Sequence, residues 1–179
     1  LRACTLRKMK ISAFKCGPDY IDPMYHREVL GVPSRNLDLF FTGEEETRAL
    51  FLADQETELS VIEGVMGLYD GLGGVSEEAS SYHLARILKA PIVLVVDAKG
   101  MGRSVVSLLA GFLQYDTEHL IRGVILNRVG KGFCAMLAPV IEEELKLSVL
   151  GCFPERKELM IESRHLGLKL PKELRELEE

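Results

Sequence analysis

The stretch Ile92-Val93-Leu94-Val95-Val96-Asp97 decides the fold of this chain. Five consecutive aliphatic residues, most of them β-branched, are typical of a strand that is buried on both faces, as in a parallel sheet. Pro91, just before the run, ends a helical pattern over residues 77–89. The carboxylate that follows the run lies where open α/β sheets bind their ligands, at the carboxyl end of a strand.

The same alternation of short apolar runs and amphipathic stretches continues in both directions. Further strands are predicted at residues 10–14, 59–62, 124–126 and 149–150, and further helices at 43–54, 103–113 and 133–145. The capping box Thr42-x-x-Glu45 is expected to open the first of these helices. An acidic, Leu-rich end after Pro171 predicts a surface helix. The pattern predicts one α/β domain with a mostly parallel sheet flanked by helices.

Composition excludes several classes of protein. The 179 residues are 47% hydrophobic and 27% charged, which excludes a disordered chain. The net charge of −5 argues against a general binder of nucleic acid or of anionic membranes. No apolar run is long enough to span a bilayer, and no secretory signal is visible. The four cysteines form no CxxC pair, so we expect reduced thiols in a cytoplasmic protein.

Charged residues also follow two further predicted strands. Glu63 closes an apolar strand and precedes Gly64. It fits either a Mg²⁺ ligand or an ordinary strand-end carboxylate bonded to a loop amide. Asp19 and Asp22 lie beside Lys15, and these three could share a metal and orient a phosphate. The alternative is structural, with an Asx bond at Asp19 and a helix N-cap at Asp22.

An amide and several cations complete the candidate residues. Asn127 follows a buried strand, where its side chain could hydrogen-bond the edge of a purine or simply form a turn. The cations that could hold an anionic substrate are Arg35, Lys99, Arg103, Arg128 and Arg164. No nucleophile elbow or Ser-His-Asp arrangement is present, which argues against a serine hydrolase.

Several blocks of the chain resemble those of the cobyrinic acid a,c-diamide synthases. The most specific are Phe14-Lys15-Cys16-Gly17-Pro18-Asp19-Tyr20-Ile21-Asp22-Pro23, with His26 after it, and Ile62-Glu63-Gly64-Val65-Met66-Gly67-Leu68-Tyr69-Asp70-Gly71, which is similar to a modified Walker B. Ser34-Arg35-Asn36-Leu37-Asp38, Gly123-Val124-Ile125-Leu126-Asn127-Arg128-Val129 and Ser163-Arg164-His165-Leu166-Gly167-Leu168 match further blocks in order. The resemblance therefore covers nearly the whole chain.

The resemblance implies a P-loop NTPase-like fold, related to dethiobiotin synthetases, and an ATP-dependent amidoligase. Such an enzyme phosphorylates the a and c carboxylates of a corrin, and ammonia from glutamine then displaces the phosphate. By resemblance, Glu63 and one of Asp19 or Asp22 would hold Mg²⁺, and Lys15 would contact the transferring phosphate. Asn127, with Arg128, would bind the nucleotide. Tyr20, Arg35, Asp70 and Arg164 would face the acidic tetrapyrrole.

Two segments of the family pattern are absent from residues 1–179. The Walker A loop, with its strand, should precede Leu1, and the glutamine amidotransferase domain should follow the block at residues 163–168. We therefore expect the chain to be the amidoligase domain of a longer enzyme, inactive by itself, with a homodimer considered as its assembly. The rival functions are a nickel-sirohydrochlorin a,c-diamide synthase and a non-catalytic or partitioning-type P-loop relative.

Overall fold

The structure, a computed structural model, describes residues 1–53, 57–156, 163–164 and 167–168. The chain forms two compact units. Unit 1 comprises Leu1–Leu88 and Ile161–Glu179, and unit 2 comprises Lys89–Met160. Each unit contains one three-stranded sheet of parallel strands.

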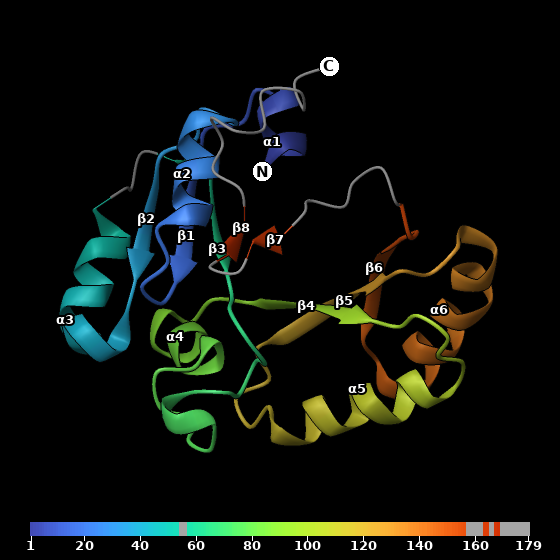
Figure 1. The fold of residues 1–179 in the computed structure, drawn as a ribbon. Coiled ribbons are helices and arrows are strands. Elements are labelled where there is room, and N and C mark those ends of the chain that lie inside the picture. Colours follow the sequence, from blue (N-terminus) through green and yellow to red (C-terminus); the bar gives the residue numbers. More distant parts are fainter. Residues whose placement is uncertain (54–56, 157–162, 165–166, 169–179) are drawn as a thin grey trace. The chain divides into compact units, whose positions relative to one another are not determined.

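Strand β1 is the centre of unit 1. It spans Ile11–Cys16 and lies between β2 (Ser34–Leu37) and β3 (Leu59–Glu63), as Figure 1 shows. All six residues of β1 are buried, which fits a strand that is paired on both edges and covered on both faces. Its side chains alternate between two apolar clusters. Phe14 and Cys16 pack with Leu37 and Leu84, and Ile11 and Ala13 pack with Val32.

Helices connect the strands of unit 1 and cover its sheet. The short α1 (Arg2–Leu6) precedes β1, α2 (Ile21–Glu28) joins β1 to β2, and α3 (Leu39–Leu52) joins β2 to β3. A 3₁₀ turn, η1 (Leu72–Gly74), and α4 (Ser81–Leu88) follow β3. Leu84 of α4 and Leu50 and Phe51 of α3 contact the Phe14 cluster. The amphipathic helices therefore bury their apolar faces against β1.

The start of α3 differs from the prediction. The helix begins at Leu39 rather than at Gly43, because the carboxylate of Asp38 accepts hydrogen bonds from the backbone N–H groups of Phe40 and Phe41. Gly43 interrupts the helix with φ 73° and ψ −177°, a backbone conformation that only glycine adopts easily. The capping box at Thr42 therefore marks a kink inside the helix and not its first residue.

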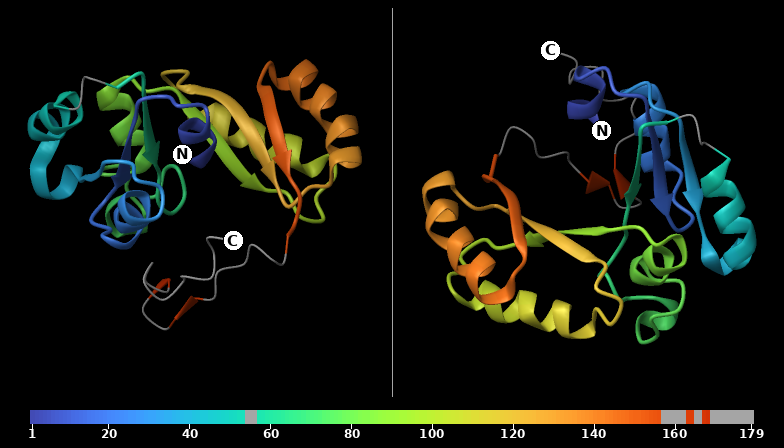
Figure 2. Two further views of the ribbon diagram at one scale, coloured as in Figure 1. Left: turned by 90° about the horizontal axis from the view of Figure 1, so that it is seen from above. Right: turned by 180° about the vertical axis from the view of Figure 1, so that it is seen from behind.

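Unit 2 repeats strand and helix in regular order. Its sheet has the order β4-β5-β6, formed by β4 (Ile92–Asp97), β5 (Ile121–Asn127) and β6 (Ser148–Phe153). α5 (Ser104–Tyr115) and α6 (Lys131–Leu145) make the two crossovers and contact each other, and Figure 2 shows both beside this sheet. Leu94 and Val96 of β4 are buried, whereas Val93 and Val95 are exposed on the opposite face. The prediction that this strand is buried on both faces is therefore wrong, because the helices of unit 2 cover only one face of β4.

A disulfide joins α6 to β6 in unit 2. It links Cys134, in the first turn of α6, to Cys152, and the two Cα atoms lie 6.3 Å apart, within the usual span of a disulfide. The prediction of four reduced thiols is therefore wrong for this pair, because spacing along the chain does not reveal which cysteines the fold brings together. Cys4 and Cys16 are free thiols.

The predicted class, parallel strands flanked by helices, is confirmed. The strands form two three-stranded sheets, however, and not the single sheet that the pattern predicted. The strand β2 was not predicted, because three of its four residues are polar. The antiparallel pair β7 (Ser163–Arg164) and β8 (Gly167–Leu168) was not predicted either. The helix predicted after Pro171 lies outside the described residues. In the part of the chain that the structure describes, no helix has the length and apolar character needed to cross a membrane.

Candidate active site

Lys15 is the centre of a cluster of carboxylates at the carboxyl end of the unit 1 sheet. Its side chain is only 6% exposed, and its Nζ lies 2.5 Å from Asp22 Oδ2 and 3.3 Å from Glu63 Oε1. Asp19 Oδ2 is 3.9 Å away. The four residues predicted to carry the chemistry are thus brought together. Their catalytic roles stay a prediction.

Strand register explains this convergence. β1 pairs with β2 and β3 so that Lys15 lies opposite Asn36 on one side and Glu63 on the other. Three polar side chains therefore form one row across the ends of three parallel strands. Asp19 and Asp22 reach the same place because the loop after β1 turns directly into α2.

The loop between β1 and α2 is held by side-chain hydrogen bonds. Asp19 Oδ1 accepts a hydrogen bond of 2.8 Å from the backbone N–H of Ile21, which confirms the Asx bond predicted there. The Asn36 amide donates to the carbonyl oxygens of Gly17 and Asp19. The prediction that Asp22 is the N-cap of α2 is wrong: Tyr20 is the N-cap, and Asp22 lies inside the first turn of the helix. Its carboxylate is therefore available to Lys15.

The electrostatics of the cluster favour a charged Lys15. Burial by itself lowers the pKa of a lysine, but here the hydrogen bond to Asp22 and the charges of Glu63 and Asp22 outweigh burial. The net pKa of Lys15 is raised above its ordinary value of 10.5. Lys15 is therefore a buried, permanent cation at neutral pH, the kind of group that a phosphate or carboxylate ligand requires.

The same carboxylates were predicted to hold a metal. Among the described residues, no group of three or more His, Cys, Asp or Glu side chains is arranged to hold a metal ion. Asp22 and Glu63 instead converge on the ammonium of Lys15. Their oxygen atoms nevertheless fit Mg²⁺, which usually takes one or two carboxylates together with substrate phosphates rather than a complete protein cage.

Three predicted substrate contacts, Tyr20, Arg35 and Asp70, lie close in the sequence to residues of this site. Tyr20 stands at the start of α2 with 69% of its surface exposed, and Arg35 is an exposed residue of β2. Asp70 is exposed in the loop after β3, where its Oδ2 accepts a 3.0 Å hydrogen bond from the Gly67 N–H. Asp70 thus folds its own loop rather than joining the Lys15 cluster.

The predicted nucleotide contacts lie in unit 2. Asn127 ends β5, and its Oδ1 accepts a hydrogen bond from the Arg128 backbone N–H. The Arg128 guanidinium makes two hydrogen bonds to the carboxylate of Asp97, which holds the pKa of Asp97 at about 2. Beside them is a cavity of about 410 Å³ lined by Arg128 and by Ala98, Gly100, Met101, Gly102, Val129, Gly130 and Phe133.

The carboxyl ends of β4 and β5 therefore carry their own pocket. Asp97 aligns with Asn127 in the register of the two strands, and Lys99 forms an ion pair with Glu155 at 2.6 Å. The last predicted substrate contact, Arg164, lies in β7, and its side chain is outside the described part of the chain.

Comparison with known sequences assigns the family. A family model described as an AAA domain matches residues 44–163, a segment that includes Glu63 and the β4 and β5 strand ends. The chain belongs to this AAA domain family. The match supports the α/β class that the strand and helix pattern predicted, and the P-loop NTPase-like fold that the resemblance implied.

Curated relatives of this AAA domain chain carry closely related names. A cobyrinate a,c-diamide synthase of Caldanaerobacter subterraneus subsp. tengcongensis is 48% identical over 164 residues, covering 90% of this chain and 36% of that protein. The Clostridium acetobutylicum synthase of the same name is 42% identical over 181 residues, covering 100% and 41%. A hydrogenobyrinate a,c-diamide synthase of Streptomyces coelicolor is 43% identical over 169 residues, covering 94% and 35%.

These similarities confirm the resemblance that the sequence blocks indicated. The chain spans about two fifths of the length of the curated relatives it matches. Two residues beside the cluster were missed as candidates, although both lie in or next to the quoted blocks. His26 Nε2 is 3.4 Å from Glu63 Oε2, and His26 Nδ1 is 2.9 Å from Ser34 Oγ. Only the fold places His26 beside Glu63 and Ser34 beside His26.

Proposed function

We propose that this chain is the ATP-dependent amidoligase part of an enzyme that converts the a and c carboxylates of a corrin to amides. The observation that carries the proposal is the buried Lys15 with Asp22 and Glu63 at the ends of β1 and β3. The identity of 48% to a cobyrinate a,c-diamide synthase over 90% of this chain supports it.

The chemistry explains why such a cluster is needed. A carboxylate is a poor electrophile, so its oxygen first takes the γ-phosphoryl group of ATP, with ADP as the leaving group. The nitrogen lone pair of ammonia then attacks the carbonyl carbon of the acyl phosphate. The C–O bond to phosphate breaks, phosphate departs with its electron pair, and nitrogen loses a proton. Glutamine would supply the ammonia through an amidotransferase domain.

The residues of the cluster have distinct parts in this proposal. Lys15 binds the anionic oxygens of the phosphoryl group in transfer, where a preorganised cation lowers the barrier most. Asp22 and Glu63, with Asp19 beside them, would hold Mg²⁺ together with the phosphates, and the metal would neutralise their charge. Because phosphoryl transfer depends chiefly on positioning, the buried setting of Lys15 matters as much as its charge.

The substrate and nucleotide have separate surfaces in the proposal. Tyr20, Arg35, Asp70 and Arg164 would contact the corrin, whose remaining carboxylates suit the arginines. Asn127 would bind the purine beside the unit 2 cavity, with Arg128 fixed in place by Asp97. Corrins with and without cobalt are both candidates, because relatives named for cobyrinate and for hydrogenobyrinate match this chain at 48% and 43%.

The test is an amidation assay on a protein of the relatives' full length that carries this chain. Cobyrinate, hydrogenobyrinate and nickel-sirohydrochlorin are each supplied with ATP, Mg²⁺ and glutamine or ammonia. Glu63→Gln keeps the shape of the side chain and removes its charge, and we expect turnover to fall about 10²-fold or more. The matched control is Glu58→Gln, just before β3 at its opposite end, where the carboxylate accepts a hydrogen bond from Lys10 N–H.

Each result has a defined meaning. Turnover of a corrin by the wild type, with loss in Glu63→Gln and little change in Glu58→Gln, supports the proposal. Turnover of nickel-sirohydrochlorin alone would show that the substrate is this tetrapyrrole and not a corrin. Near-normal turnover by Glu63→Gln at saturating Mg²⁺ would reduce Glu63 to a structural strand-end residue.

A further inference from the structure

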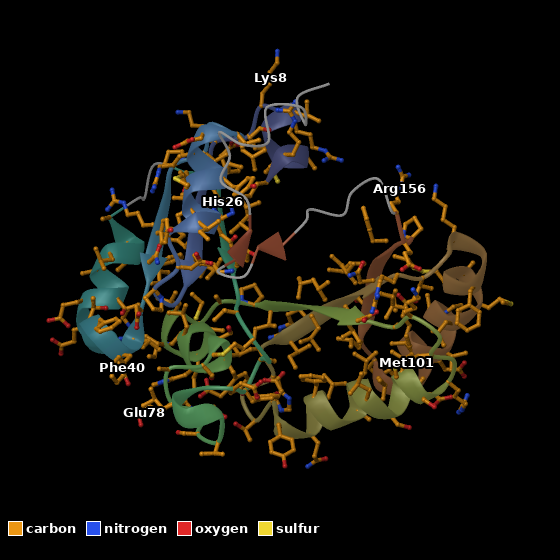
Figure 3. All side chains as sticks on the ribbon, in the orientation of Figure 1. Lys8, His26, Phe40, Glu78, Met101 and Arg156 are labelled. Atoms are coloured by element: carbon orange, nitrogen blue, oxygen red, sulfur yellow. A yellow bond between two sulfur atoms is a disulfide. The ribbon has the colours of Figure 1, made fainter. Side chains whose placement is uncertain are left out.

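His26 joins three elements of unit 1 at the edge of the Lys15 cluster. It lies on α2, where Figure 3 labels it, and it is 7% exposed. Its Nδ1 is 2.9 Å from Ser34 Oγ on β2, and its Nε2 is 3.4 Å from Glu63 Oε2 on β3. The imidazole thus lies between the buried hydroxyl of Ser34 and the carboxylate of Glu63 at the end of β3.

The partners determine how the ring is used. An ionised carboxylate only accepts hydrogen bonds, so the ring nitrogen that faces Glu63 must carry the hydrogen. In the neutral ring the other nitrogen, Nδ1, is then an acceptor, and the Ser34 hydroxyl donates to it. The arrangement is directional: the Ser34 hydroxyl donates to His26 Nδ1 at 2.9 Å, and the N–H at His26 Nε2 faces Glu63 Oε2 at 3.4 Å, a polar contact longer than an ordinary hydrogen bond.

The two oxygens of Glu63 are held by different partners. Oε1 lies 3.3 Å from Lys15 Nζ, and Oε2 faces His26. The Glu63 side chain is 47% exposed, and a half-exposed glutamate with several rotatable bonds ordinarily samples many conformations. Contacts at both oxygens restrict the carboxylate to one orientation, whereas Lys15 alone leaves it free to rotate about a single contact.

We propose that His26 is a positioning residue for Glu63, fixed in turn by Ser34. The inference rests on the proposed function, in which Glu63 helps to hold Mg²⁺ beside the phosphates. Partners that orient a ligating side chain typically matter about 10-fold to 100-fold in metal affinity or activity when they are removed. His26 therefore acts through Glu63 and does not touch the substrate.

A second histidine of unit 1 provides a matched control. His83 on α4 accepts a hydrogen bond from Ala79 N–H at its Nδ1, and its Nε2 lies 3.6 Å from Glu44 Oε1. The geometry resembles that of His26 and Glu63. Glu44, however, belongs to α3 and is 60% exposed. If removing any histidine beside a carboxylate lowered kcat and Mn²⁺ affinity, the loss would be equal in His26→Ala and His83→Ala.

The experiment compares His26→Ala, His26→Gln, Ser34→Ala and His83→Ala in the full-length enzyme. In His26→Ala we expect the kcat for amidation and the affinity for Mn²⁺ each to be about 10-fold to 100-fold lower than in the wild type. The Mn²⁺ affinity is measured by water-proton relaxation in the presence of a non-hydrolysable ATP analogue. The KM for the corrin should not change. Ser34→Ala should shift both quantities in the same direction by less, and His26→Gln, whose amide N–H can reach Glu63, should recover part of the loss.

A spectroscopic readout is independent of turnover. Long-range ¹H–¹⁵N NMR of the wild type should show His26 with hydrogen on Nε2, and Ser34→Ala should perturb the Nδ1 resonance. The inference is overturned if the hydrogen lies on Nδ1 in the neutral ring. It is also overturned if His26→Ala and Ser34→Ala keep the kcat and Mn²⁺ affinity of His83→Ala. If His26→Ala does not fold, Ser34→Ala and His26→Gln decide the point.

The two proposals can fail separately. If the wild type amidates no tetrapyrrole, the proposed function is wrong, but the tautomer and the Mn²⁺ affinities still show whether His26 orients Glu63. If the wild type amidates a corrin and the His26 variants match His83→Ala in every readout, only the positioning role is wrong.

Discussion

Replacing Lys15 with methionine tests whether the charge cluster holds β1 and α2 together. The side chain of Lys15 is 6% exposed, while those of Asp22, Asp19 and Glu63 are 21%, 34% and 47% exposed. Methionine fills a similar volume but leaves these carboxylates facing one another without a cation. Removing one partner of a fully buried pair costs about 3–5 kcal/mol, and an exposed pair is worth about 0–1 kcal/mol.

The partial exposure of the carboxylates places the cost between these limits. We expect Lys15→Met to lower the free energy of unfolding by about 2 kcal/mol, which is roughly a 30-fold change in the unfolding equilibrium. The matched control is Lys99→Met. Lys99 Nζ is 2.6 Å from Glu155 Oε1, but the two side chains are 52% and 43% exposed, so the cost there should stay below about 1 kcal/mol.

Urea denaturation followed by far-ultraviolet circular dichroism measures both variants, since the chain has no tryptophan. The sign of the pH dependence provides a second check. A lysine with a raised pKa stabilises the fold at every pH below its unfolded pKa, and this contribution is lost as pH rises through the folded pKa. Because the pKa of Lys15 lies above 10.5, the difference between wild type and variant should be equal at pH 7 and pH 9. A cost no larger than that of Lys99→Met would refute the reasoning.

Two further predictions concern unit 2. Reducing the Cys134–Cys152 disulfide, whose cysteines are 18 positions apart, should lower the free energy of unfolding by about 3 kcal/mol, measured as a shift of the urea midpoint on adding dithiothreitol. Cys134→Ser should abolish that shift, and an equal midpoint with and without reductant in the wild type would contradict it. Arg128→Gln should raise the pKa of Asp97 from about 2 toward its ordinary value of about 4, measured by carboxyl-carbon NMR titration. In the wild type, the stabilisation from the Arg128–Asp97 pair is present above the unfolded-state pKa of Asp97 and is lost as the pH falls toward 2. An Asp97 titration that is unchanged in Arg128→Gln would contradict the pairing.

The fold could be predicted from the sequence wherever local pattern and burial agree. The run Ile92–Val96 is a strand because five aliphatic residues leave no polar face, and Pro91 separates it from the preceding helix. Prediction failed where tertiary contacts outweigh local pattern. Ser34-Arg35-Asn36-Leu37 has little strand character. It nevertheless pairs with β1, because β1 is the central strand and its backbone hydrogen-bonds to a neighbouring strand on each edge.

The site shows the same division between local pattern and three-dimensional placement. Lys15, Asp19, Asp22 and Glu63 could be predicted as neighbours, because residues that follow parallel strands meet at one edge of a sheet. What the carboxylates bind there could not be predicted from spacing. The register of the strands places Lys15 between Asn36 of β2 and Glu63 of β3, and a Mg²⁺ ion held by the neighbouring carboxylates stays a prediction.

This arrangement has a direct consequence for how the proposed enzyme would load its ligands. Because Lys15 is already paired with Asp22 and Glu63, the protein holds no unpaired buried charge at this cluster, and the cluster costs little stability. In the proposed function, a phosphate and a divalent cation that bind together would exchange these partners: Lys15 would contact the phosphate oxygens, and Asp22 and Glu63 would hold the metal. Net charge in the site changes little in that exchange. Nucleotide and metal are therefore expected to bind together more tightly than either binds alone, and a titration of each in the presence and absence of the other would measure the difference.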